Sequence, residues 1–154
     1  MKKILVTALV ATMLTISLIG CGGDPYADVS PKAIVQQLET EYVRMPMPVD
    51  EAMAQEMYHI NLDDVEEYAI TKTGMSPGVG FAMVVKAKDG KVDAVKEAVD
   101  KVLADQVNAA FYPDEKEIAE AAEVKVDGNI VSLLIFHSEV SADVEKVYQE
   151  ALDK

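Results

Sequence analysis

Residues 79–103 read VGFAMVVKAKDGKVDAVKEAVDKVL, and from this stretch the architecture can be worked out. Residues 79–88 are typical of a β-strand, because two sets of side chains alternate along them. One set is Phe81, Met83, Val85 and Ala87, and the other is Ala82, Val84, Lys86 and Lys88. Asp89 and Gly90 then favour a turn. Beyond the turn, apolar residues recur at helical spacing, namely Val92, Val95, Val99, Val102 and Leu103. The stretch therefore predicts a strand followed directly by a long amphipathic helix.

Three more strands are predicted on either side of this unit. Residues 68–73 precede it, and the connection over residues 74–78, GMSPG, is rich in turn formers. Residues 123–126 and 129–137 form a later pair of strand-like runs. Asp127-Gly128 between them is the turn sequence of a tight hairpin. The strands therefore fall into two neighbouring pairs.

Four further helical segments are predicted, of which the first is the best defined. Ser30 is a suitable N-cap, and Pro31 fits the first helical position. This helix ends before Met45 and carries an apolar face of Ile34, Val35, Leu38 and Tyr42. Shorter helices are expected over residues 51–58 and after Pro113, and a last helix from Ser141, with Val144, Val147, Tyr148 and Ala151 inside.

These elements predict an α+β fold. We expect an antiparallel sheet of about four strands in the order strand-strand-helix, strand-strand-helix, with the helices packed on one face. An N-terminal helical segment precedes the sheet. The length of the chain suits a single domain, expected over residues 30–154.

Residues 1–20 have the pattern of a secretory signal. Lys2 and Lys3 are followed by an apolar run over residues 4–19. This run is shorter than the roughly 20 apolar residues of a permanent transmembrane helix. We therefore expect residues 1–20 to direct export and then to be removed.

Leu18, Ile19, Gly20 and Cys21 match the lipobox of bacterial lipoproteins. In the lipoproteins that this segment resembles, a lipid is attached to the cysteine and a signal peptidase recognises the three residues before it. We expect Cys21 to be the lipidated N-terminus and residues 21–29 to be its tether. The two or three acyl chains that the resemblance implies would hold the protein on the extracytoplasmic face of the cell membrane.

The composition excludes several classes of function. The chain has 27 acidic against 14 basic residues, for a formal charge of −13, and Arg44 is its only arginine. Such a chain lacks the basic patch that nucleic acids require. Cys21 is the only cysteine, and its use for lipid leaves none for a disulfide or a thiolate metal site. No cofactor is expected, and contact with the membrane is expected through the lipid.

Neither histidine indicates a site. His59 is expected at a helix end and His137 at a strand end, and neither stands at metal-ligand spacing from another candidate ligand. The carboxylates Asp63, Asp64, Glu66 and Glu67 suggest a site for Ca²⁺ or Mg²⁺, but they lack the spacing of a calcium loop. After Asn61 they fit better as first-turn acids that stabilise a helix N-terminus.

The methionines, serines and glycines do not indicate a specific site either. Met45, Met47, Met53 and Met57 are soft ligands that suit copper(I), although core filling along a helix face is the commoner role and contact with a partner is a third. Ser76 and Ser132 lack the Gly-x-Ser-x-Gly surroundings of a hydrolase nucleophile. Residues 74–80 are glycine-rich but lack the Lys-Ser/Thr pair of a phosphate loop. No enzyme activity is predicted.

Several short motifs resemble one protein family in the same order. The first runs from Tyr58 through Ile60 to the D-V-E-E-Y of residues 64–68, and the second is K-A-K-D-G-K over residues 86–91, which runs into residues 95–98. Tyr112-Pro113 and Gly128-Asn129 follow. They resemble the short lipoproteins of domain-of-unknown-function family 4358 (DUF4358), common in clostridial and related Gram-positive bacteria. The resemblance implies a lipoprotein in a one-membrane host and assigns no activity. His137, followed by Ser138 and Glu139, departs from the family pattern.

The sequence thus predicts a membrane-anchored lipoprotein. Its domain is expected to be a non-enzymatic accessory or interaction domain with a protein partner at the membrane surface. The alternative is a lipoprotein that binds a small solute or a cation, as the acidity and the methionines suggest.

Overall fold

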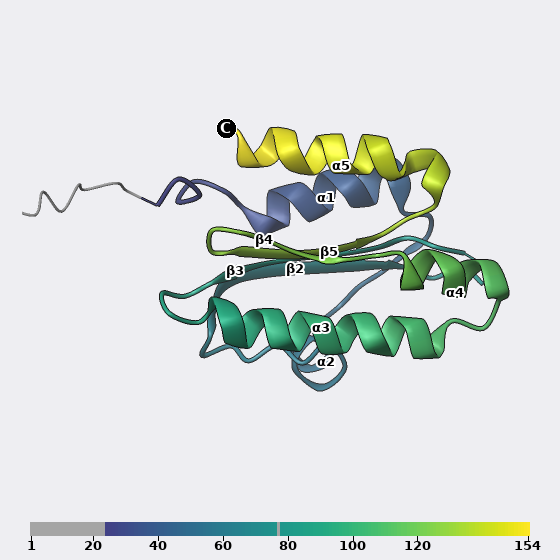
Figure 1. The fold of residues 1–154 in the computed structure, drawn as a ribbon, viewed down its shortest axis with the longest axis horizontal. Helices are drawn as coiled ribbons and strands as arrows, with labels where there is room; N and C mark the ends of the chain where they lie inside the picture. The colour runs from purple at the N-terminus through teal and green to yellow at the C-terminus, as the bar shows by residue number, and fades with distance from the viewer. Residues whose placement is uncertain (1–23, 77) are drawn as a thin grey trace, which may run out of the picture.

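The computed structural model describes residues 24–76 and 78–154. Five strands form one antiparallel sheet in the order β1-β2-β3-β5-β4, with helices on both sides (Figure 1). The elements are α1 Pro31–Tyr42, β1 Pro46–Met47, α2 Glu51–Glu56, β2 Val65–Thr73, β3 Phe81–Ala87, α3 Val92–Ala109, α4 Pro113–Glu120, β4 Val124–Asp127, β5 Ile130–Ile135 and α5 Ser138–Leu152.

The predicted α+β class, the antiparallel sheet and the preceding N-terminal helix are confirmed. Ser30 is the N-cap of α1, and its side chain accepts a hydrogen bond from the backbone N–H of Ala33 at 3.3 Å. Gly128, with φ of 59°, turns the chain between β4 and β5. The order strand-strand-helix occurs twice, with α4 added after α3 and the short β1 added at one edge. The predicted turn residue Pro77 lies outside the described residues.

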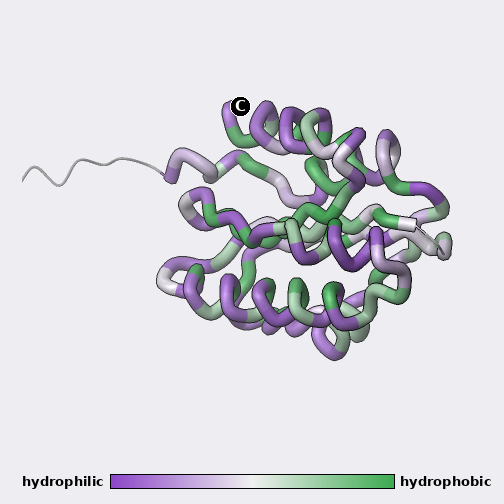
Figure 2. Tube along the Cα trace, turned by 45° about the vertical axis from the view of Figure 1, so that its right-hand side comes forward, coloured by the Kyte–Doolittle hydropathy of each residue, from purple (hydrophilic) through white to green (hydrophobic). Residues whose placement is uncertain are grey.

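The helices cover both faces of the sheet, whereas the sequence prediction placed them on one. In the middle strand β3, Phe81, Met83 and Val85 pack toward α3, and Ala82 and Val84 pack toward α1 and α5. Every residue of β3 is buried. A strand that is apolar on both faces must be covered on both, so a second helical layer is required. Figure 2 shows the same arrangement, with apolar segments in the middle layer and alternating character along the outer helices.

The last helix begins earlier than predicted. His137 is the N-cap of α5, so Ser138 to Val140 belong to the helix and not to a loop. Among the described residues, no helix has the length and apolar character needed to cross a bilayer.

Candidate functional site

The two histidines lie in different layers of the fold. His59 follows α2 in a left-handed conformation, with φ of 55°, and its Nε2 lies 2.8 Å from the Asp105 carboxylate on α3. The side chains of His59 and Asp105 are 37% and 56% exposed, so water screens this pair. His137 is exposed at the start of α5, against the other face of the sheet. The structure therefore builds no common imidazole site.

The acidic cluster at residues 63–67 does not start a helix, so that prediction is wrong. Residues 62–64 form a turn, and Val65 begins β2, whose pairing with β3 overrides the local preference for a helix start. Asp64 forms an ion pair with Lys91 at 2.7 Å, and the hydrogen bond from Lys91 lowers the pKa of Asp64. Glu67 accepts hydrogen bonds from Ser30 Oγ and the backbone N–H of Lys32 at the start of α1.

These carboxylates therefore have separate structural partners. In the part of the chain that the structure describes, no three His, Cys, Asp or Glu side chains gather in a way that could hold a metal ion. Cation binding stays a prediction without a described site.

The methionines singled out in the sequence are mostly exposed, which contradicts the core-filling role. Met45 is 70% exposed, and Met47 and Met57 are also open to solvent. The methionine that fills the core is Met83 on β3. Met57 was expected on the apolar side of its helix, but Ala54 and Tyr58 bury the face that contacts the sheet.

The serine and glycine candidates do not form a catalytic or phosphate site. Ser76 is exposed in the β2–β3 connection, and Ser132 is fully buried on β5. The backbone N–H of Gly78 donates a 2.8 Å hydrogen bond to the Glu115 carboxylate of α4. The Glu115 carboxylate thus accepts the hydrogen bond that the Gly78 N–H could otherwise offer to a phosphate.

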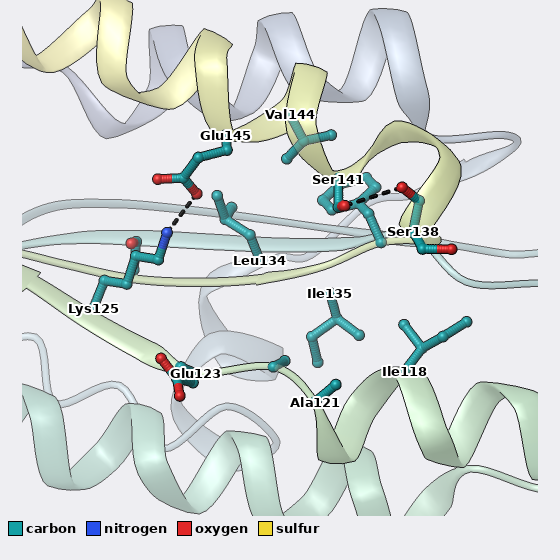
Figure 3. Close-up of a pocket in the computed structure, with 13 residues that line it drawn as sticks. Ile118, Ala121, Glu123, Lys125, Leu134, Ile135, Ser138, Ser141, Val144 and Glu145 are labelled. Carbon is teal, nitrogen blue, oxygen red and sulfur yellow. Dashed lines mark hydrogen bonds and ion pairs between the residues drawn. The ribbon is translucent and has the colours of Figure 1, made fainter.

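A cavity of about 320 Å³ opens beside the start of β4 and the end of β5, between α4 and α5 (Figure 3). Its walls are mainly apolar, with Ile118 from α4, Leu134 from β5 and Val144 from α5. Lys125 and Glu145 form an ion pair on one side of it, where the hydrogen bonds from Lys125 and Gln149 outweigh the effect of burial and lower the pKa of Glu145.

Ser132 is the buried polar group in the wall of this cavity. Its hydroxyl has no hydrogen-bond partner within residues 24–76 and 78–154. The Tyr148 hydroxyl donates to Asp127 at 2.8 Å. The cavity therefore offers apolar surface, one ion pair and a single buried hydroxyl.

The described part of the predicted tether, residues 24–29, packs against the domain. Lys86 on β3 is only 7% exposed, and its Nζ donates to the backbone carbonyls of Tyr26 and Ala27 at 3.1 and 2.6 Å. Asn129 donates to the Asp24 carboxylate at 2.8 Å. The chain thus enters the domain beside the β4–β5 hairpin. Lys86 was not predicted to have a role, although a lysine inside an otherwise apolar strand was a visible signal.

The opposite end of the sheet carries exposed apolar side chains. The segments after α1, after β2 and after α3 meet at this end, away from the N-terminal segment (Figure 1). The backbone N–H of Gly74 bonds to the carbonyl of Met45, which brings two of these segments together. Phe111 is 84% exposed and packs edge-on against Tyr112. We call this group the apolar tip, and it consists of Met45, Met47, Met75, Phe111 and Tyr112.

The residues predicted for lipid attachment and cleavage, Leu18, Ile19, Gly20 and Cys21, lie outside the described residues, as does the rest of the signal segment 1–20.

Comparison with known proteins gives one match. Residues 39–136 match the family described as Domain of unknown function (DUF4358), a span that runs from within α1 to the end of β5. No curated protein and no solved structure matches the chain significantly. The match covers more than half of the chain and includes the whole sheet. The chain therefore belongs to the DUF4358 family.

Proposed function

We propose that this chain is a lipid-anchored, extracytoplasmic protein whose domain is a non-enzymatic interaction module. The observation that carries this proposal is the arrangement of its two ends. Residues 24–29 pack at one end of the domain, and the apolar tip lies at the other. With a lipid on Cys21, the tip would face away from the membrane.

Several features support a binding role for the tip. A soluble domain rarely exposes several large apolar side chains together unless they serve recognition. Methionine and aromatic side chains are enriched at protein interfaces, where methionine adapts to partners of different shape. Arg44, the only arginine of the chain, is exposed directly before Met45. Arginine is likewise enriched at interfaces.

The test is crosslinking on intact cells followed by mass spectrometry. Four forms are compared: the wild type, Cys21→Ser, the double variant Met45→Ser/Phe111→Ser, and Met57→Ser. Met57 is exposed but lies outside the tip, so it serves as the matched control. We expect one dominant partner that is lost in the second and third forms and kept in the fourth. The absence of any reproducible partner would refute the proposal.

The cavity between α4 and α5 favours a second candidate, which is binding of a small solute. Its volume of about 320 Å³ and apolar walls suit a compact, largely apolar molecule. Thermal unfolding with a metabolite panel tests this candidate. We expect a saturable rise in Tm with one compound, and loss of that rise in Ala121→Phe, which fills the cavity. A panel without any saturable shift would exclude it.

A further inference from the structure

Over residues 67–71 the outer edge of β2 has no strand paired with it among the described residues, and we call this stretch the open edge. β1 pairs only with Lys72 and Thr73, at the end of the strand. The backbone N–H of Thr73 points to β3, where it bonds to Gly80, while that of Gly74 points outward to Met45. Because successive residues of a strand direct their backbone groups to opposite sides, those of Ile70 and Tyr68 also point outward.

These outward groups have no partner among residues 24–76 and 78–154. No hydrogen bond within that part of the chain engages the backbone N–H or C=O of Tyr68 or Ile70 on the side away from β3. The open stretch from Glu67 to Thr71 is roughly 17 Å long at the usual rise of a strand. It can therefore accept an added strand of about five residues.

The edge at β4 differs from this one. β4 has only four residues, and Lys125 lies near its middle, paired with Glu145. Short edge strands with a lysine are a common protection against unwanted pairing. The stretch from Val65 to Thr71 contains no lysine and no proline, so protection of this kind is missing from that stretch, and Lys72 follows it in β2.

The charges around the open edge are mostly negative. The Glu39 carboxylate accepts a hydrogen bond from Thr71, Glu67 accepts one from Ser30, and Glu66 lies 3.9 Å from Lys86. On the α3 side, burial raises the pKa of the Tyr68 hydroxyl, and the charges of Glu51 and Asp50 raise it further. Lys32 and Lys72 adjoin the edge, as does Arg44, whose backbone carbonyl accepts a hydrogen bond from Thr73. Lys86 is already held by backbone carbonyls. Five carboxylates thus flank the open stretch: Glu39, Asp50, Glu51, Glu66 and Glu67.

We propose that the open edge of β2 binds an extended, basic segment of a protein partner, which adds to the sheet as a strand in line with β1. Backbone hydrogen bonds to Tyr68 and Ile70 would hold this segment, and its lysine or arginine side chains would face the flanking carboxylates. A second copy of the chain suits the edge poorly, since each copy carries a net charge of −13. This inference rests on the proposed interaction role and names the chemistry of the partner.

The test uses two synthetic heptapeptides, one alternating lysine and valine and one alternating glutamate and valine. Each is added to the full chain in detergent micelles, and amide hydrogen exchange is measured residue by residue. We expect the lysine peptide to slow exchange at Tyr68 and Ile70 by about tenfold or more, because new backbone bonds protect these groups. The glutamate peptide is expected to have no effect at either residue.

Two proline variants make the test specific to the edge. Ile70→Pro removes an outward N–H of β2 without removing a bond to β3, and is expected to abolish binding of the lysine peptide. Val126→Pro is the matched control. The backbone carbonyl of Asn129 bonds to β3, so the backbone groups of the next residue, Ile130, are directed to β4, where they meet Asp127. By alternation, the backbone N–H of Val126 points outward from the β4 edge of the sheet. This control is expected to bind normally.

A charge-reversed variant covers the case in which Ile70→Pro does not fold. Glu51→Lys/Glu66→Lys changes two exposed side chains and is expected to weaken binding of the lysine peptide by about tenfold. Equal binding of both peptides, protection at β4 in place of β2, or self-association of the chain would each overturn the proposal. If the edge stays unprotected while crosslinking through the apolar tip persists in cells, the added strand is wrong and the interaction role stands.

Discussion

The two ends of the sheet are built from different interactions. At the end where the chain enters, polar side chains are paired: Lys86 with two backbone carbonyls, Asp127 with Tyr148, and Asp64 with Lys91. At the apolar tip, large side chains such as Met45 and Phe111 are left open to solvent. At the first end the polar groups bind one another within the chain, whereas at the second the apolar side chains remain available to a binding partner.

This difference indicates how stability and recognition are divided. Hydrogen bonds of buried charged groups stabilise a fold, and their loss is costly because the partner groups are left unsatisfied. Exposed apolar side chains contribute little to stability. Substitutions at the entry end should therefore change the free energy of unfolding, and substitutions at the tip should change binding alone.

Among substitutions at the entry end, Lys86→Ala should lower the stability of the fold most strongly. It removes two hydrogen bonds from a buried charge and leaves the carbonyls of Tyr26 and Ala27 without their donor. We expect a loss of about 3 kcal/mol in the free energy of unfolding, measured with urea, and faster proteolysis within residues 24–29. Lys146→Ala, which breaks only an exposed pair with Glu150, should cost less than about 0.5 kcal/mol. Equal losses in the two variants would show that the hydrogen bonds of Lys86 to Tyr26 and Ala27 do not stabilise the fold.

Gly128→Ala tests the packing of the N-terminal segment. An added Cβ would overlap the ring of Tyr26, and the backbone at φ of 59° disfavours any side chain. We expect a loss of about 2 kcal/mol by urea denaturation. Gly90→Ala has a similar φ of 73° but meets nothing within 4 Å, so it should cost only about 1 kcal/mol. If both variants lose the same amount, Tyr26 does not pack there.

Tyr148→Phe sharpens the comparison through pH. It removes the hydrogen bond to Asp127 and should cost about 1 kcal/mol at neutral pH. Burial, with the neighbouring Asp127 and Glu145, raises the pKa of Tyr148 in the folded state. The stability that this shift contributes is fully present below the pKa of tyrosine in the unfolded chain, about 10. It is lost as the pH rises through the pKa of Tyr148 in the folded state. The wild type should therefore lose its advantage over Tyr148→Phe above about pH 10, as urea titrations at successive pH values will show.

Substitution at the apolar tip should have the smallest effect on stability. Met45→Ser and Phe111→Ser change exposed side chains, so the free energy of unfolding should shift by less than about 0.5 kcal/mol. The same variants should lose the partner crosslink. A large fall in Tm would mean that these side chains support the fold, and the two ends would no longer differ in the way described.

Local signals in the sequence predicted most elements of the fold. Ser30-Pro31 determines a helix start and Asp127-Gly128 a hairpin turn through local backbone preferences alone, and both are found where they were predicted. The alternating pattern of residues 79–88 did not predict the second helical layer, because Lys86 and Lys88 make the set that contains Ala82 and Val84 look partly polar. From Phe81 to Val85 both sets are apolar, and such a run indicates burial on two faces.

The features of the candidate site were harder to predict because they depend on contacts between distant segments. Glu67 looks like a helix-start acid in the sequence, yet it caps α1 from β2, 37 residues away from Ser30. The exposure of Met45 and Phe111 depends on where three loops meet, which no local pattern records. The open edge of β2 depends on the shortness of β1, and the two residues Pro46–Met47 leave no strand signal.

The strand order also has a consequence for how the chain folds. β2 with β3, and β4 with β5, are local hairpins, and such hairpins form early because little loop entropy is lost. Within the sheet, the two hairpins are joined by the pairing of β3 with β5, between residues 81–86 and 130–135. Until β5 arrives, β3 has an unpaired edge in the middle of the future sheet. Closing that one distant contact is therefore the slow step expected to limit the rate of folding.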